Sequence, residues 1–202
     1  MEATGSGVAS AGHTYAAAGF YHPVATVIDR LGASATSPPT RVVVTDPLAG
    51  YEVGSGMVPS QAGAYTARPD ATGYVTLKQL YVRPAADGSL SDPANSFYMS
   101  FSAGNFAFSS TSLQWLVMSG NKAWVMGKGI ATADGLNEEC FFLLSTVDST
   151  TAADRVRVKI WSQVTGEVRY DNQRDASGAS APDEADAIPM VATGPGTILF
   201  AK

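Results

Sequence analysis

Carboxylate and amide side chains gather at the ends of expected strands in the second half of the chain. Two aspartates flank the turn at residues 149–153, an Asp-Asn pair stands in a later turn, and an acidic cluster follows it. Calcium binds six to eight oxygens, drawn from carboxylates, amides and backbone carbonyls on loops that can bend. The sequence therefore predicts a calcium cofactor, with these candidate ligands: Asp148, Asp154, Asp171, Asn172 and Asp183.

The same residue types are also typical of ordinary turns. Short acidic and amide side chains accept hydrogen bonds from nearby backbone N–H groups, which would explain Asp154 and Asp171 without any metal. The spacing matches neither an EF-hand loop nor a glycine-aspartate repeat. A calcium site and a set of solvated turn residues therefore both stay open at the level of sequence.

The sequence lacks the motifs of the common hydrolases. There is no G-x-S-x-G elbow, no H-E-x-x-H motif and no paired His or Cys ligands for zinc. Cys140 stands beside two phenylalanines and far from His13 and His22, so we expect a small buried residue rather than a nucleophile. Glu138 and Glu139 remain as spare carboxylates for a cation-assisted attack on a carbonyl. Whether the protein is an enzyme stays open.

Aromatic side chains on the expected strands form a second kind of candidate site. An outward-facing ring can stack on a sugar, although aromatic residues in strands more often complete the core. The sequence predicts a platform for a polysaccharide or a small molecule, with these candidate residues: Trp115, Trp124, Trp161 and Tyr170.

The elements that position these residues are expected to be short strands. In Arg155–Trp161 the apolar side chains alternate with polar ones, the period of a half-buried strand. Short strands separated by turn signals favour a jelly-roll-like antiparallel sandwich, an all-β fold. A turn followed by a strand is expected at Ala62–Ala67. Further strands are expected at Tyr74–Val82, Gln114–Met118, Ala123–Ile130, Phe141–Thr146, Asp154–Trp161, Glu167–Tyr170 and Thr197–Ala201.

Composition narrows the classes of partner. The 202-residue chain has a formal net charge of −5, which disfavours nucleic acid and anionic membranes. No apolar run approaches the roughly 18 residues of a membrane span. Residues 1–12 are rich in small residues and are predicted to be flexible. They show no signal peptide, so an exported protein would contain this chain as a piece of something longer.

Residues 13–45 contain three motifs in a row. An H-x-Y turn (His13–Tyr15) leads to a G-x-Y (Gly19–Tyr21) and to a strand that ends in V-x-D-x-x-G (Val27–Gly32). This order resembles the C-terminal part of a PKD repeat, an immunoglobulin-like sandwich of bacterial surface proteins. Such a remnant lacks some of its strand partners. We therefore expect these N-terminal strands either to pack on the main sandwich or to form a homodimer.

Residues 46–202 resemble the post-COAP-type C-terminal module of bacterial cell-surface proteins. The resemblance implies a β-sandwich module that serves adhesion, anchoring or ligand binding outside the cell, and it implies no catalytic residues. The alternative is a calcium-dependent hydrolase of a small ester or lactone. The matching segments are Gly50–Gly56, Ala62–Ala67, Phe101–Asn105, Ser110–Ser112, Trp115–Val117, Gly127–Gly129, Val156–Trp161, Tyr170–Asn172 and Gly196–Lys202.

Overall fold

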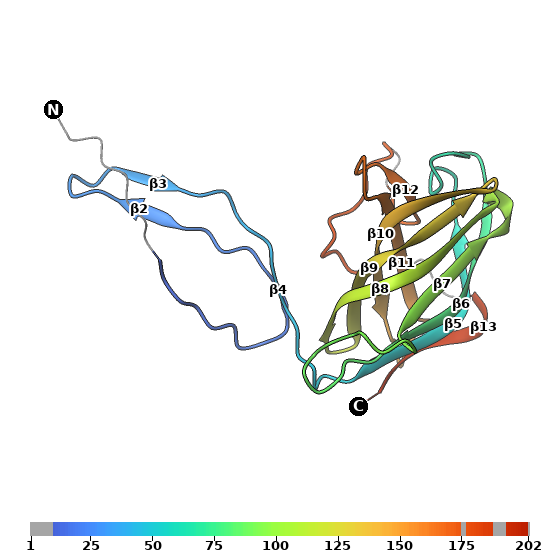
Figure 1. The fold of residues 1–202 in the computed structure, drawn as a ribbon, viewed down its shortest axis with the longest axis horizontal. Helices are drawn as coiled ribbons and strands as arrows, with labels where there is room; N and C mark the ends of the chain where they lie inside the picture. The colour runs from blue at the N-terminus through green and yellow to red at the C-terminus, as the bar shows by residue number, and fades with distance from the viewer. Residues whose placement is uncertain (1–9, 175–176, 188–192, 202) are drawn as a thin grey trace.

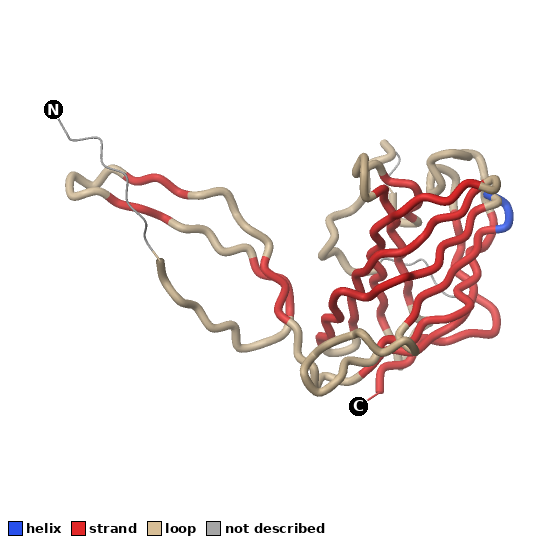
Figure 2. The backbone as a smooth tube through the Cα atoms, viewed as in Figure 1, coloured by secondary structure: helices blue, strands red, loops and turns tan. Residues whose placement is uncertain are grey.

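Strands dominate the computed structural model, which describes residues 10–174, 177–187 and 193–201 (Figures 1 and 2). An N-terminal arm, residues 10–44, extends from a domain built on one large sheet (Figure 1). The predicted all-β, antiparallel fold is confirmed. The prediction of a flexible segment at residues 1–12 falls mostly outside the described residues.

The large sheet has nine antiparallel strands in the order β12-β11-β10-β9-β8-β7-β6-β5-β13. Consecutive strands are neighbours from β5 to β12, so this part is a meander of hairpins, and β13 returns to pair with β5. The bounds are β5 Tyr51–Ser60, β6 Gly73–Val82, β7 Ser96–Phe101, β8 Phe106–Ser119, β9 Lys122–Ala133, β10 Leu136–Val147, β11 Arg155–Ser162, β12 Val168–Asp171 and β13 Thr193–Ala201.

The sheet curls, so that its two halves face each other as the layers of a sandwich. The Tyr170 hydroxyl on β12 lies 3.0 Å from Ser60 Oγ on β5, although these strands are far apart in the sheet order. The Thr146 hydroxyl on β10 likewise donates to Glu52 on β5. Register shifts in β8, between Ser110 and Ser112 and again before Trp115, add bulges of the kind that bend strands.

The space between the two layers is filled by apolar side chains. Aromatic rings form its centre, with Phe97 and Phe142 stacked at 5.1 Å between centroids. The strand alternation explains this core, since every second residue of β7 and β11 is buried. Cys140 is fully buried, as expected, and burial raises the pKa of its thiol to about 11.

A second apolar layer covers part of the outer face of the sheet. Trp124 and Leu143 alternate with core residues, yet both are buried. The segment 177–187 lies over them, and the Arg157 guanidinium holds it by donating to the carbonyls of Ala181 and Pro182 at 2.8 Å. This outer layer comprises Val117, Trp124, Leu143, Val147 and Ala187.

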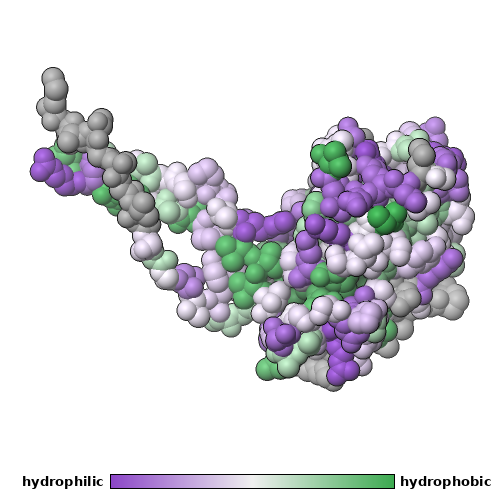
Figure 3. Space-filling model, viewed as in Figure 1, coloured by the Kyte–Doolittle hydropathy of each residue, from purple (hydrophilic) through white to green (hydrophobic). Residues whose placement is uncertain are grey.

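The arm consists of two antiparallel pairs of short strands. β1 (Gly19–Tyr21) pairs with β4 (Val42–Val44), and β2 (Thr26–Ile28) pairs with β3 (Ser34–Thr36). Its base packs on the large domain, where apolar atoms gather in Figure 3. Its tip is exposed, including Val27 and Ile28. The expectation that these strands pack on the main domain is confirmed for the base, and association of two copies through the tip stays a prediction.

Two details of the expected strands were wrong. The turn expected within Ala62–Ala67 is present, but the strand expected after it is only an isolated bridge from Tyr65 to Tyr170. The glycine-containing segment before it, β5, is a ten-residue strand that pairs on both sides.

Among the described residues, no helix is long and apolar enough to cross a membrane.

Candidate ligand-binding site at the mouth of the sheet

The four residues of the predicted aromatic platform do not form one surface. Tyr170 is fully buried in the core, where its hydroxyl lies 3.0 Å from Ser60 Oγ and burial raises its pKa. The prediction that Tyr170 binds ligand is therefore wrong. Its sequence pattern was misleading because β12 turns this side chain inward, against Phe106, with ring centroids 6.0 Å apart.

The three predicted tryptophans lie on the outer face, where Trp124 is buried and Trp115 and Trp161 are half-buried. Phe20 of the arm packs edge-on against Trp115 and Trp124, at 5.6 and 5.4 Å between centroids. The Lys159 ammonium lies 5.1 Å from the centre of the Trp161 ring. These rings contact the arm and the strand surface, and ligand binding by them stays a prediction.

The predicted calcium ligands are used by protein groups. Asp171 forms a fully buried ion pair with Arg157, and Asn172 bonds to the backbone of β11 through both ends of its amide. Asp183 pairs with Lys159 and Arg41. Burial would raise the pKa of Asp183, but these two cations outweigh it and lower the pKa.

The remaining two predicted ligands lie in one turn. Asp154 accepts a hydrogen bond from the Ser149 N–H at 3.0 Å, the local contact expected of a turn residue. Asp148 begins the same turn, with its N–H bonded to the Asn121 carbonyl. In the described part of the chain, no group of three or more His, Cys, Asp or Glu residues is placed to hold a metal ion. Calcium binding stays a prediction.

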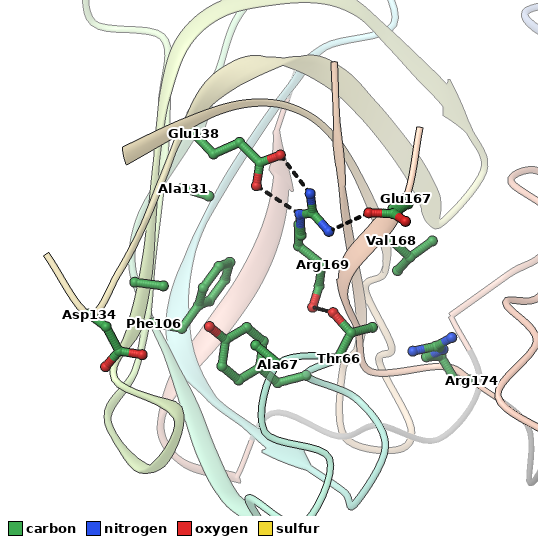
Figure 4. Close-up of a pocket in the computed structure, with 12 residues that line it drawn as sticks. Thr66, Ala67, Phe106, Ala131, Asp134, Glu138, Glu167, Val168, Arg169 and Arg174 are labelled. Atoms are coloured by element: carbon green, nitrogen blue, oxygen red, sulfur yellow. Dashed lines mark hydrogen bonds and ion pairs between the residues drawn. The ribbon is translucent and has the colours of Figure 1, made fainter. Parts of the chain in front are cut away.

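A concave site lies at one end of the curled sheet, and we call it the mouth pocket (Figure 4). Its volume is about 760 Å³, within the range of small-molecule sites, which often occupy the mouths of curled sheets and barrels. The ends of β8, β9, β10 and β12 and the turn at residues 65–67 form its wall. Its lining residues are Tyr65, Thr66, Ala67, Phe106, Ala131, Ala133, Asp134, Glu138, Glu167, Val168, Arg169 and Arg174.

Arg169 is the central polar group of the mouth pocket. Its Nε and Nη2 donate to the two oxygens of Glu138, at 2.7 and 2.9 Å, and its Nη1 donates to Glu167 at 2.9 Å (Figure 4). This pairing lowers the pKa of Glu138 and raises that of Arg169. A guanidinium has five N–H donors, so these three bonds leave two for a ligand.

The Asp134 carboxylate forms part of the rim. Its Oδ1 accepts bonds from Arg68 and, at 2.7 Å, from Asn105 Nδ2. The Asn105 bond and the nearby Arg68 charge lower the pKa of Asp134. Asn105 and Asp134 have φ of 49° and 51°, the left-handed region that Asn and Asp tolerate better than other side chains. Both turns thus place their polar side chains at the rim.

The inner wall of the mouth pocket is apolar. Tyr65 and Phe106 pack at 4.9 Å between centroids and separate the pocket from the core. Burial and the Asp134 charge raise the pKa of the Tyr65 hydroxyl, so Tyr65 stays neutral. Ala131, Ala133 and Ala67 add small surfaces that leave room for a ligand.

The hydrogen bonds and charges around the pocket carboxylates favour the ionised form of Asp134 and Glu138. Asp134 and Glu138 both have lowered pKa values, so neither is a proton donor near neutral pH. The described carboxyl with a clearly raised pKa is Glu52, to about 7, and it is fully buried inside the sheet. The pocket can therefore offer charged hydrogen-bond acceptors, and the Arg169 donors, to a ligand.

Sequence reasoning found Glu138 as a spare carboxylate and missed Arg169, Asp134 and Tyr65. The Glu138–Arg169 pair spans 31 residues, and no local pattern reveals such a contact. The one sequence signal was the Asp134-Gly135 dipeptide, which is typical of a tight hairpin turn.

A scan of protein-family models, a search of curated proteins and a search of solved structures all found no match to this chain. The resemblance to PKD and post-COAP modules therefore stays a prediction.

Proposed function

We propose that this protein is a non-catalytic binding module that holds a neutral, hydroxyl-rich ligand, such as a sugar, in the mouth pocket. The observation that carries the proposal is the Glu138–Arg169–Glu167 group at the centre of this pocket. It presents fixed donors and acceptors beside an apolar wall, the combination that recognises a sugar ring with its hydroxyl groups and its C–H face.

Charge balance supports a neutral ligand. Arg68 pairs with Asp134, and Arg169 pairs with both Glu138 and Glu167, while Arg174 donates to the backbone carbonyls of Gly178 and Gly63. The lining thus carries no large excess of either charge, and an ionic ligand would compete with these pairs for its counter-charge. Hydroxyl groups can use the remaining hydrogen-bonding positions without disturbing the pairs.

The wider role that we propose is adhesion or anchoring outside the cell, with a polysaccharide as partner. The support for this role is the resemblance of residues 46–202 to modules of bacterial cell-surface proteins. A calcium ion that stabilises the module belongs to the same proposal, with the turn at Asp148 and Asp154 as its candidate place.

The test begins with a glycan array carrying neutral and uronic-acid-containing oligosaccharides of one to six units. We expect neutral glycans to bind and Ala67→Trp to abolish binding, because Ala67 is an exposed residue whose larger replacement fills the mouth pocket. Leu48→Trp is the matched control, since Leu48 is 80% exposed and does not line this pocket. Unchanged binding by Ala67→Trp would refute the site.

A second measurement separates binding from catalysis and tests for the ion. Generic ester and lactone substrates are incubated with the protein in calcium and then in EDTA, and a thermal melt is recorded in both buffers. Turnover that disappears with EDTA would contradict the non-catalytic proposal. A calcium-selective rise in the melting midpoint without turnover would support a structural ion, because a ligand of the native state stabilises it.

A further inference from the structure

A second, smaller pocket adjoins the mouth pocket at the rim. It has a volume of about 230 Å³ and shares Phe106 and Asp134 with the mouth pocket. We call it the outer pocket. Its lining residues are Ser100, Phe101, Ser102, Asn105, Phe106, Ala107, Thr132, Asp134 and Gly135.

The two pockets lie on opposite faces of the sheet end. Ala131 and Ala133 of β9 line the mouth pocket, whereas Thr132 between them lines the outer pocket. Successive side chains of a strand point to opposite faces. A molecule that occupied both pockets would therefore leave the mouth, cross the rim at the Asp134-Gly135 turn, and continue on the outer surface.

Asp134 is placed to contact such a molecule at the crossing. Its Oδ1 holds Arg68 and Asn105, which fix the carboxylate. Its side chain is 52% exposed, and a carboxylate has further lone pairs that can accept a hydroxyl. Asp134 thus offers a fixed acceptor between the two pockets.

The chemistry of the outer pocket matches that of the mouth. The hydroxyl side chains of Ser100, Ser102 and Thr132 line it together with the Asn105 amide, and Asp134 is the charged residue among its described lining residues. From these observations we infer that the ligand is a linear chain of at least two neutral sugar units. One unit occupies the mouth pocket and the next occupies the outer pocket, with Asp134 contacting both. This inference rests on the function proposed above.

An extended peptide is a poorer fit to this surface. Peptides that bind sheets commonly add a strand to a free edge, where unpaired backbone groups are available. The outer pocket is built from strand ends and hairpin turns at β7 to β9, in the middle of the sheet order. The mouth pocket also includes β12, which is an edge strand, but the turn at residues 64–66 already bonds to that edge: the Thr66 N–H donates to the Arg169 carbonyl and the Asp171 N–H donates to the Ala64 carbonyl. Hydroxyl groups, by contrast, need only side-chain partners.

The experiment measures how affinity depends on chain length. Isothermal titration compares the one-, two- and three-unit members of the best-binding neutral series from the glycan array. We expect the two-unit sugar to bind at least tenfold more tightly than the single unit, with little further gain for three. Thr132→Trp, at an exposed strand position of the outer pocket, should remove this gain and leave single-unit affinity unchanged. Asp134→Asn should reduce it, because Asn tolerates the backbone but lacks the second carboxylate oxygen.

The outcomes distinguish the two proposals. Equal affinity for one and two units, or a length preference that survives Thr132→Trp, would overturn the two-pocket inference while leaving the mouth pocket as a binding site. No binding by any glycan, or binding that Ala67→Trp does not affect, would overturn the proposed function and this inference with it. Leu48→Trp again serves as the control for an added exposed tryptophan.

Discussion

Glu52 is a buried carboxyl whose protonation is linked to the stability of the fold. It lies fully buried on β5, where burial raises its pKa to about 7 against the weaker opposing effect of the Thr146 hydroxyl bond. The folded protein therefore keeps this proton at pH values where the unfolded chain has lost it. The stabilisation is fully present below about pH 4.5 and is lost as the pH rises to about 7.

Glu52→Gln should remove this pH dependence. We expect the variant to match the wild type near pH 4.5 and to exceed its free energy of unfolding by roughly 3 kcal/mol above pH 7.5, since each pKa unit corresponds to about 1.4 kcal/mol. Urea unfolding across this pH range measures the difference. Glu139→Gln, on an exposed side chain, is the control and should behave like the wild type. A difference between Glu52→Gln and the wild type that stays constant with pH would contradict the assignment.

The Arg157–Asp171 pair gives a second prediction at this scale. Both side chains are fully buried, so Asp171→Leu leaves the guanidinium without its counter-charge. We expect a loss of about 3–5 kcal/mol in the free energy of unfolding. The double variant Arg157→Met with Asp171→Leu should recover much of that loss, because it removes both charges. Arg157→Met is also measured alone. If the double variant loses as much free energy of unfolding as Arg157→Met and Asp171→Leu added together, the pair is not coupled as described.

Among the elements of the large sheet, most strands could be predicted from the sequence, whereas β5 could not. The expected strands at Ala123–Ile130 and Phe141–Thr146 fall inside β9 and β10, because alternation and β-branched or aromatic residues are local signals. β5 was missed because Gly54 and Gly56 interrupt the pattern, and glycine is depleted in strands. Pairing with β6 and β13 compensates for that weak propensity, and pairing is not a local property.

The site was harder to predict than the strands for the same reason. Asp171 and Asp183 were expected to face a cation, and the residues that they face instead are Arg157, Lys159 and Arg41. An acidic residue on one strand can pair with an arginine on its neighbour once the two strands align. The sequence alone does not show which strands align. Composition indicated that polar groups gather here, but only the fold determines their partners.

Gly129 in β9 packs tightly against β8, beside one of the bulges that bend that strand. A Cβ at this position would lie 2.3 Å from the Ser109 carbonyl oxygen and 2.5 Å from the Phe108 ring, beside the β8 bulge. We expect Gly129→Ala to lower the free energy of unfolding by about 3 kcal/mol, because a backbone atom of a paired strand cannot move aside easily. Gly12→Ala, which has nothing within 4 Å, is the control. An unchanged melting temperature for Gly129→Ala would show that β8 can shift to make room for the added methyl group.

At the scale of the whole molecule, the structure combines the arm, residues 10–44, with the domain built on the large sheet. The outer layer under segment 177–187 could not be predicted from the sequence. Trp124 and Leu143 alternate with core residues, so the pattern places them on an exposed face, yet both are buried. The arm and this segment meet there. Asp183 bonds to Arg41 of the arm and to Lys159 of β11, so one carboxylate joins three parts of the chain.

This junction predicts how a protease cuts the arm. Arg30 lies in the exposed hairpin turn of the tip, whereas Arg41 is held by Asp183 at 3.0 Å, next to the paired strand β4. Trypsin should therefore cut after Arg30 first and after Arg41 much more slowly. Phe20→Ala removes the contact with Trp115 and Trp124, and it should speed cleavage after Arg41 several-fold while leaving the Arg30 site unchanged. Val24→Ala is the control, because Val24 is in the arm but 55% exposed. Mass spectrometry of timed digests gives both rates, and equal cleavage at the two sites in the wild type would mean that the arm base is not docked in solution.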